Sequence, residues 1–112
     1  MNSIKWALFG IRNTWREEMN FRIEITGAIV ASITSWYLGF DWLEWIIVIG
    51  CITIVLAAEM INTAIEDLCN KVEPAIDPAV GKIKDMMAGF TLLSSLGATL
   101  IGVILFGRHL FS

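Results

Sequence analysis

The sequence predicts an all-α membrane protein in which an N-terminal amphipathic surface helix precedes three transmembrane helices. Hydrophobic residues make up 56% of the 112-residue chain and charged residues only 17%, and the mean hydropathy is +0.69. A soluble domain of this size cannot bury so much apolar side chain, so the bilayer is the expected solvent. Three apolar stretches separated by short polar segments supply the spans. The whole chain, residues 1–112, is expected to form one domain.

Residues 1–20 have the pattern of a helix that lies in the membrane surface. Charged side chains occupy the other faces of this segment, while apolar residues recur at helical spacing, namely Ile4, Leu8, Ile11 and Trp15. An interfacial anchor, with tryptophan and basic side chains at the depth of the lipid headgroups, explains most of these residues. Only Glu18 calls for another explanation.

The first two transmembrane helices are expected over residues 21–40 and 43–70. The first stretch is about long enough to cross the hydrocarbon core of roughly 30 Å, with Arg22 and Glu24 at one end and a Trp-Tyr pair at the other. The second follows a short acidic turn. Its apolar run continues without a helix breaker into a polar extension that reaches Asn70.

A hydrophilic loop is expected over residues 71–84, because this segment contains Pro74, Pro78 and Gly81 together with mixed charge. The third span follows over residues 85–106. It is rich in Gly, Ala, Ser and Thr, which allow close approach of helix backbones. Three short helices bury little surface, so we expect the chain to oligomerise.

The basic residues predict how the chain is oriented. Only Arg108 lies near the C-terminal end, whereas all other Lys and Arg residues lie on the opposite side of this map, at positions 5, 12, 16, 22, 71, 82 and 84. The positive-inside rule therefore places the N-terminus and the second loop in the cytoplasm. The net charge is −3 and no basic tract is present, so nucleic acid is not an expected partner.

One polar stripe crosses the end of the second span. At 100° per residue its members fall within about 100° of one another, and they are Glu59, Asn62, Thr63, Glu66 and Asn70. Counting about 20 residues of span from Leu43 puts the hydrocarbon boundary near Thr63. Glu59 is then just inside the boundary, and Glu66 lies roughly 10 Å farther along the axis in the cytosol.

Two carboxylates with different hydration suit two different roles. A desolvated carboxylate such as Glu59 can take a proton from an alcohol, whereas a hydrated one such as Glu66 can hold a hard cation such as Mg²⁺. Lys84-Asp85, entering the third span at the same depth, adds a cation suited to a phosphate oxygen. The plainer alternatives are that the stripe only joins helices by hydrogen bonds and that Lys84 only snorkels to the interface.

The sequence resembles the prokaryotic diacylglycerol kinase and undecaprenol kinase family over nearly its whole length. The resemblance rests on three segments, WREEMNFR at 15–22, AEMINTAIE at 58–66 and GKIKDMMAG at 81–89. It implies a homotrimeric bundle in a bacterial inner (plasma) membrane, with active sites shared between neighbouring subunits on the cytoplasmic side. It also implies ATP-dependent phosphorylation of a lipid alcohol.

The same resemblance assigns roles by position. Glu59 would be the general base, and Glu18 and Glu66 would hold the ATP-bound Mg²⁺. The nucleotide contacts, with Asn62 supporting the site, would be Trp6, Glu18, Asn62, Glu66, Asp77, Lys84 and Asp85. The lipid would approach Arg12, Trp15, Asn20, Arg22 and Glu59.

The acceptor and two rival functions stay open. The wording NFRIE and AEMINTAIE is closer to the undecaprenol kinase branch, but diacylglycerol also presents a hydroxyl at the interface on hydrocarbon tails. A small multidrug or ion transporter could use an intramembrane acid such as Glu59, but would need it near mid-membrane. A purely structural subunit is the other alternative. Neither rival should consume ATP with a long-chain alcohol.

Overall fold

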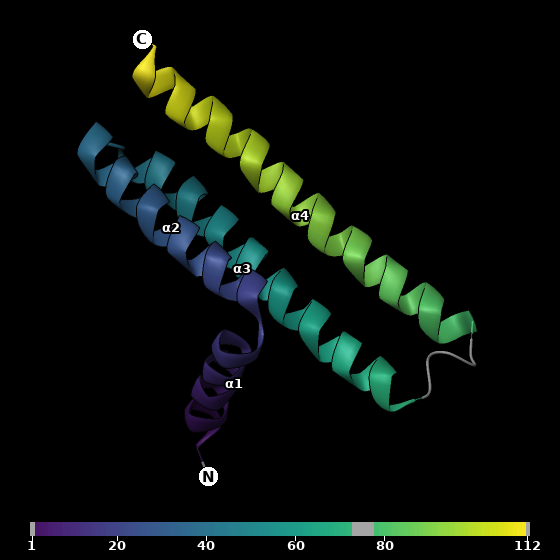
Figure 1. Ribbon diagram of the computed structural model, residues 1–112. Helices are drawn as coiled ribbons and strands as arrows, with labels where there is room; N and C mark the ends of the chain where they lie inside the picture. The colour runs from purple at the N-terminus through teal and green to yellow at the C-terminus, as the bar shows by residue number, and fades with distance from the viewer. Residues whose placement is uncertain (1, 73–77, 112) are drawn as a thin grey trace.

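The computed structural model describes residues 2–72 and 78–111, which form four helices and, within those ranges, no strand. The helices, in chain order, are α1 (Ser3–Glu17), α2 (Met19–Leu38), α3 (Trp42–Lys71) and α4 (Pro78–Leu110). The helices α2 and α4 lie alongside α3, and α1 turns away from them at the end where α2 begins (Figure 1). The two ends of the chain lie at opposite ends of the molecule (Figure 1).

Local sequence explains where the helices begin and end. The side chain of Asn2 accepts a hydrogen bond from the N–H of Ile4 and so caps α1. Gly39, with φ of 76°, adopts the left-handed conformation that ends α2 without steric cost. Asp41 and Glu44 form a reciprocal capping box that starts α3, with bonds of 2.8 and 3.0 Å.

The structure moves several of the expected boundaries, and the last helix runs to Leu110 and not to residue 106. The first helix ends at Glu17 and the second begins at Met19, so the break lies before residue 20 and the two helices meet at the extended residue Glu18. The loop expected over residues 71–84 is shorter, because α4 already begins at Pro78. Proline is favoured in the first turn of a helix, where its missing N–H costs nothing.

A small apolar and aromatic cluster joins the three long helices at the end remote from α1. Phe40 is buried there against Val48 of α3 and Leu105 of α4. The ring of His109 stacks on Phe40 at a centroid distance of 4.5 Å, and its Nε2 lies 2.7 Å from a carboxylate oxygen of Glu44. This cluster ties the C-terminal end of α4 to the α2–α3 turn.

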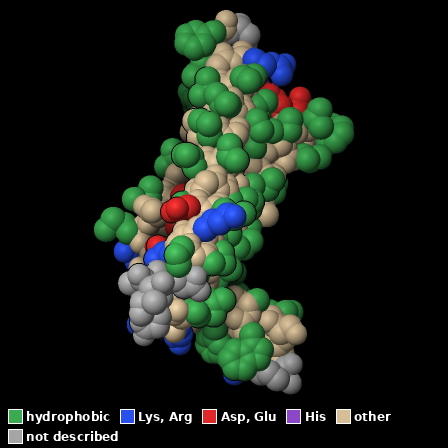
Figure 2. Space-filling view, turned by 90° about the vertical axis from the view of Figure 1, so that its right-hand side faces the viewer, with side chains coloured by type: hydrophobic (Ala, Val, Ile, Leu, Met, Phe, Trp, Pro, Cys, Tyr) green, Lys and Arg blue, Asp and Glu red, His purple; other side chains and the backbone are tan. Residues whose placement is uncertain are grey.

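The long helices present most of their apolar surface outward. Two of them, α3 and α4, are long and apolar enough to cross a membrane, and only 22% and 6% of their most apolar segments is buried. The core helix of a soluble protein would instead be mostly buried. On the face drawn in Figure 2, hydrophobic side chains cover most of the upper part of the molecule, and charged side chains lie near its top and again around and below its middle.

Candidate active site

The polar stripe of α3 runs from buried to exposed positions along one uninterrupted helix. Glu59 is 4% exposed and Thr63 is 6% exposed, Asn62 is half-buried, and Glu66 and Asn70 are exposed. The hydroxyl of Thr63 donates a hydrogen bond of 2.9 Å to the main-chain carbonyl of Glu59, which satisfies the hydroxyl within the helix. The stripe therefore joins a desolvated carboxylate to a hydrated one.

The corner between α1 and α2 brings Glu18 to this stripe. Glu18 is extended (φ −115°, ψ 113°), and its N–H donates to the carbonyl of Thr14 at 2.9 Å. The guanidinium of Arg22 reaches back across the corner and donates to the last carbonyls of α1, at 2.7 Å to Trp15 and 3.1 Å to Arg16. These charge-assisted bonds hold the end of α1 against the first turn of α2.

Four glutamates converge around the buried stretch of α3. Glu18 and Glu66 both lie within electrostatic reach of the Glu59 carboxylate, and Glu59 in turn acts on Glu24 of α2. Within residues 2–72 and 78–111, the only contact at ion-pair distance joins Glu44 and His109. It lies at the other end of the molecule. The four glutamates therefore have no cationic partner among the residues that the structure describes.

This arrangement fits a Mg²⁺ ion that arrives with a nucleotide. Among the described residues, no group of three His, Cys, Asp or Glu side chains could hold a metal ion by itself. Magnesium bound with substrate phosphates needs only one or two protein carboxylates, because phosphate oxygens and water fill the other positions. Glu18 and Glu66 can supply those carboxylates, with uncompensated negative charge to attract the cation.

The first turns of α4 contribute a cation beside the exposed end of the stripe. The Lys84 ammonium donates a hydrogen bond of 3.1 Å to the side-chain oxygen of Asn70 on α3. Lys84 is half-buried and Asp85 is exposed. Lys84 therefore lies about one helical turn beyond Glu66, at the exposed end of the stripe.

The other residues singled out by the sequence are spread along α1 and the corner. Trp6 is 64% exposed near the start of α1, where its ring packs on Phe9 at 6.1 Å between centroids. Arg12, Trp15 and Asn20 are exposed, whereas Arg22 is half-buried and engaged with the end of α1. Asp77 lies outside the described residues.

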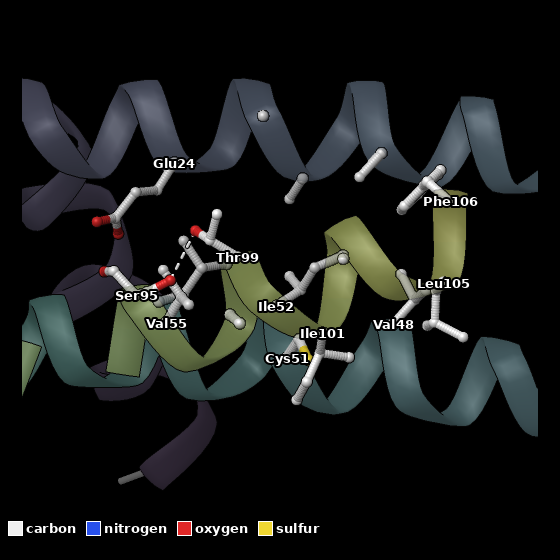
Figure 3. A pocket seen from close by; sticks show the side chains of 16 residues that line it. Glu24, Val48, Cys51, Ile52, Val55, Ser95, Thr99, Ile101, Leu105 and Phe106 are labelled. Atoms are coloured by element: carbon white, nitrogen blue, oxygen red, sulfur yellow. Dashed lines mark hydrogen bonds between the residues drawn. The ribbon is translucent and has the colours of Figure 1, made fainter. Parts of the chain in front are cut away.

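Glu24 was read in the sequence only as a charged flank of the first span, and the structure gives it a more specific place. It lies at one end of a cavity of about 460 Å³ between α2, α3 and α4, whose walls are otherwise mostly apolar (Figure 3). Its Oε2 atom is buried and has no hydrogen-bond partner among the residues that the structure describes. An ionisable side chain inside an expected span is the signal that could have marked it.

Comparison with known proteins gives a consistent result. The profile of the family described as prokaryotic diacylglycerol kinase matches residues 5–106. The chain is 27% identical to a diacylglycerol kinase of Haemophilus influenzae, over 95% of this chain and 92% of that protein. It is 31% identical to a diacylglycerol kinase of Helicobacter pylori, over 92% and 77% of the two chains. An undecaprenol kinase of Bacillus subtilis is 28% identical, over 87% and 79%.

Proposed function

Because the chain belongs to the prokaryotic diacylglycerol kinase family and is a lipid kinase, we propose that it transfers the γ-phosphoryl group of ATP to a membrane lipid alcohol at the cytoplasmic interface. The observation that carries this proposal is the stripe on α3, with a buried Glu59 and an exposed Glu66 on one continuous helix. A phosphoryl transfer between lipid and water needs groups at both depths, in that order.

On the lipid side, Glu59 is the general base. The acceptor hydroxyl donates its proton to the Glu59 carboxylate as its oxygen bonds to the γ-phosphorus, and the bond from that phosphorus to the β–γ bridging oxygen breaks to release ADP. The apolar cavity that ends at Glu24 has a volume typical of ligand sites and suits a hydrocarbon tail. Its unpaired carboxylate oxygen could accept a hydrogen bond from the lipid headgroup. Arg12, Trp15, Asn20 and Arg22 flank this approach at the corner of α1 and α2.

On the water side, Glu18 and Glu66 would hold the metal ion and Lys84 would contact the phosphates. Mg²⁺ supplied with ATP would neutralise phosphate charge and orient the chain of phosphates. The Lys84 ammonium would donate hydrogen bonds to phosphate oxygens. Asn62, one turn from both Glu59 and Glu66, supports the site. Trp6, Asp77 and Asp85 remain proposed nucleotide contacts.

Two acceptors are candidates. We take undecaprenol first, from the wording of the motifs at residues 20–24 and 58–66. Diacylglycerol is equally supported, because relatives of both names match the chain over most of its length. Both acceptors are alcohols with long hydrocarbon tails, so the apolar cavity suits either.

The proposal includes three spans and a homotrimer. The helix α2 has 20 residues and packs beside α3, but Arg22, Glu24 and several hydroxyl side chains lower its hydropathy. Within the described residues, α3 and α4 are the helices that meet both the length and the hydropathy of a span. We place α2 across the membrane as well, with the N-terminus and site in the cytoplasm of a bacterial cell. In a homotrimer, the neighbouring subunits would cover the polar stripe of each chain and complete each site.

The test is lipid phosphorylation by the purified chain in detergent micelles with Mg²⁺ and radiolabelled ATP. Undecaprenol and dioleoylglycerol are supplied separately and then in competition, and the product is the labelled lipid phosphate. Transfer to at least one lipid, lost in Glu59→Gln, is the expected result. A chain that binds neither ATP nor lipid, or that phosphorylates neither alcohol, would sink the proposed function.

A further inference from the structure

Asn70 has no role in the chemistry proposed above, yet its side chain forms a hydrogen bond between the polar stripe and α4. Its Oδ1 atom lies 3.1 Å from the Nζ atom of Lys84. An ammonium group can only donate, so the amide oxygen, and not the amide nitrogen, faces it. The contact joins the last turns of α3 to the first turns of α4, next to the segment that connects the two helices.

The chemistry of this contact differs from that of an ion pair. An amide oxygen fixes the direction of the Lys84 ammonium without neutralising its charge, whereas a carboxylate in the same place would compete with phosphate for it. Of the three ammonium protons, one is used by Asn70 and two stay available. Holding a flexible lysine in place before the ligand arrives reduces the entropy lost on binding.

The position also matches the proposed nucleotide site. Asn70 lies four residues beyond Glu66 on the same face of α3, which is about 6 Å farther along the helix axis toward water. A phosphate chain that meets the metal at Glu66 would extend in that direction. The Lys84 ammonium then faces phosphates beyond the one that is transferred.

We propose that Asn70 is a positioning residue that holds the Lys84 ammonium, with its full charge, against the phosphates of the bound nucleotide. This inference rests on the proposed function, because it takes Lys84 as a phosphate contact. Asn70 is not expected to touch the reacting atoms. Its loss should therefore weaken nucleotide binding and leave the chemical step nearly unchanged.

The experiment measures KM for MgATP and kcat for lipid phosphorylation by the full chain in detergent micelles, with dioleoylglycerol and undecaprenol in parallel. Asn70→Ala should raise KM about three- to fivefold, the size of an exposed polar contact, with kcat within about twofold. Asn70→Asp should raise KM at least as much, because the new carboxylate pairs with Lys84 and repels the phosphates. Asn70→Gln, which keeps the amide, should retain most of the affinity of the unmodified chain for MgATP.

A matched control separates this contact from general electrostatics. Lys71→Gln lowers the net charge by the same amount as Asn70→Asp, one residue away and on an exposed side chain, and should leave KM unchanged. Lys84→Gln should raise KM about tenfold, and Lys84→Gln with Asn70→Ala should be no worse than Lys84→Gln alone. Such non-additivity is expected when one residue acts through another.

The outcomes separate a failure of the role of Asn70 from a failure of the proposed function. A normal KM in Asn70→Ala and Asn70→Asp, beside an impaired Lys84→Gln, would overturn the role of Asn70 and leave the nucleotide site intact. Additive effects in the double variant would overturn it as well, since Asn70 would then act without Lys84. A normal KM in Lys84→Gln would overturn this inference together with the proposed phosphate contact, whereas absent lipid phosphorylation in the unmodified chain would overturn the proposed function itself.

Discussion

Glu59 and Glu66 are the same side chain placed in opposite surroundings, two helical turns apart on α3. The structure buries Glu59 to 4% exposure, while Glu66 is open to solvent. Burial removes water that would otherwise compete for the acceptor hydroxyl, and exposure lets a hydrated cation approach. This difference in burial is what suits the two carboxylates to the different functions that we propose for them.

The replacement Glu59→Gln tests the proposed role of Glu59 as the general base. It preserves size and a hydrogen-bonding group but removes the base, so turnover should fall by about 10² or more while nucleotide binding survives. Lipid phosphorylation and ATP affinity are measured on the same purified sample. Asp67→Asn, an acid-to-amide change on an exposed residue of the same helix, is the control and should remain active. Near-normal turnover in Glu59→Gln would remove it from the mechanism.

The replacements Glu66→Gln and Glu18→Gln test the proposed binding of Mg²⁺. Each removes one carboxylate from the proposed metal position, so the Mg²⁺ concentration for half-maximal activity should rise several-fold and ATP should bind more weakly. Excess Mg²⁺ should partly restore activity, because the remaining ligands still bind the ion. Titrations of activity against Mg²⁺ at fixed ATP provide the measurement. An unchanged Mg²⁺ dependence in both variants would contradict the assignment.

Periodicity alone places the stripe on one face of a helix, because residues 59, 62, 66 and 70 follow the 3.6-residue repeat. No such repeat encodes the contacts of Arg22 or the cavity position of Glu24. Arg22 caps the carbonyls of a different helix, and Glu24 becomes informative only when α3 and α4 are packed beside it. The sequence repeat therefore predicts which residues share a helix face, but it does not predict which residues of different helices touch.

At the scale of helices, the corner between α1 and α2 is the element that positions Glu18. The sequence contains no Gly or Pro at this point, so no helix breaker marks Glu18, and the apolar pattern places the boundary near residue 20 instead. The two bonds from the Arg22 guanidinium explain why the chain can turn there, since they satisfy carbonyls that the interrupted helix leaves free. The early start of α4 has a local reason instead, namely a proline in its first turn.

The replacement Arg22→Gln tests this corner. Losing the bonds to the carbonyls of Trp15 and Arg16 should cost about 1–3 kcal/mol of local stability, because the donor is charged. Amide hydrogen exchange should then quicken across residues 14–20 and stay unchanged in the middle of α3. Arg16→Gln, on an exposed side chain of the same turn, is the control for loss of charge. Unaltered exchange at the corner would show that packing alone holds α1 in place.

At the scale of the molecule, the outward-facing apolar surface requires a covering. The described chain buries few large side chains, and the polar stripe of α3 is only partly covered by α1 and α2. Lipid can cover apolar faces but leaves polar groups unsatisfied, so a second protein surface is needed beside the stripe.

We propose that a closed oligomer meets this need, with a trimer as the expected size. Its mass in detergent, corrected for bound detergent, should equal three copies of the 12.5 kDa chain. A stable monomer with full activity would contradict shared sites.

The capping box at the start of α3 has a consequence for membrane thickness. From Asp41 to Glu59 the helix rises about 27 Å, which is close to the thickness of a bilayer's hydrocarbon core. If the polar cap stays at one interface, this straight segment acts as a ruler that sets the depth of the base at the other. Bilayers with longer acyl chains should draw Glu59 away from the aqueous nucleotide, and thinner ones should force the helix to tilt. Activity in vesicles of monounsaturated lecithins with increasing chain length should therefore pass through a maximum, and inserting residues before Glu59 should move that maximum toward thicker membranes.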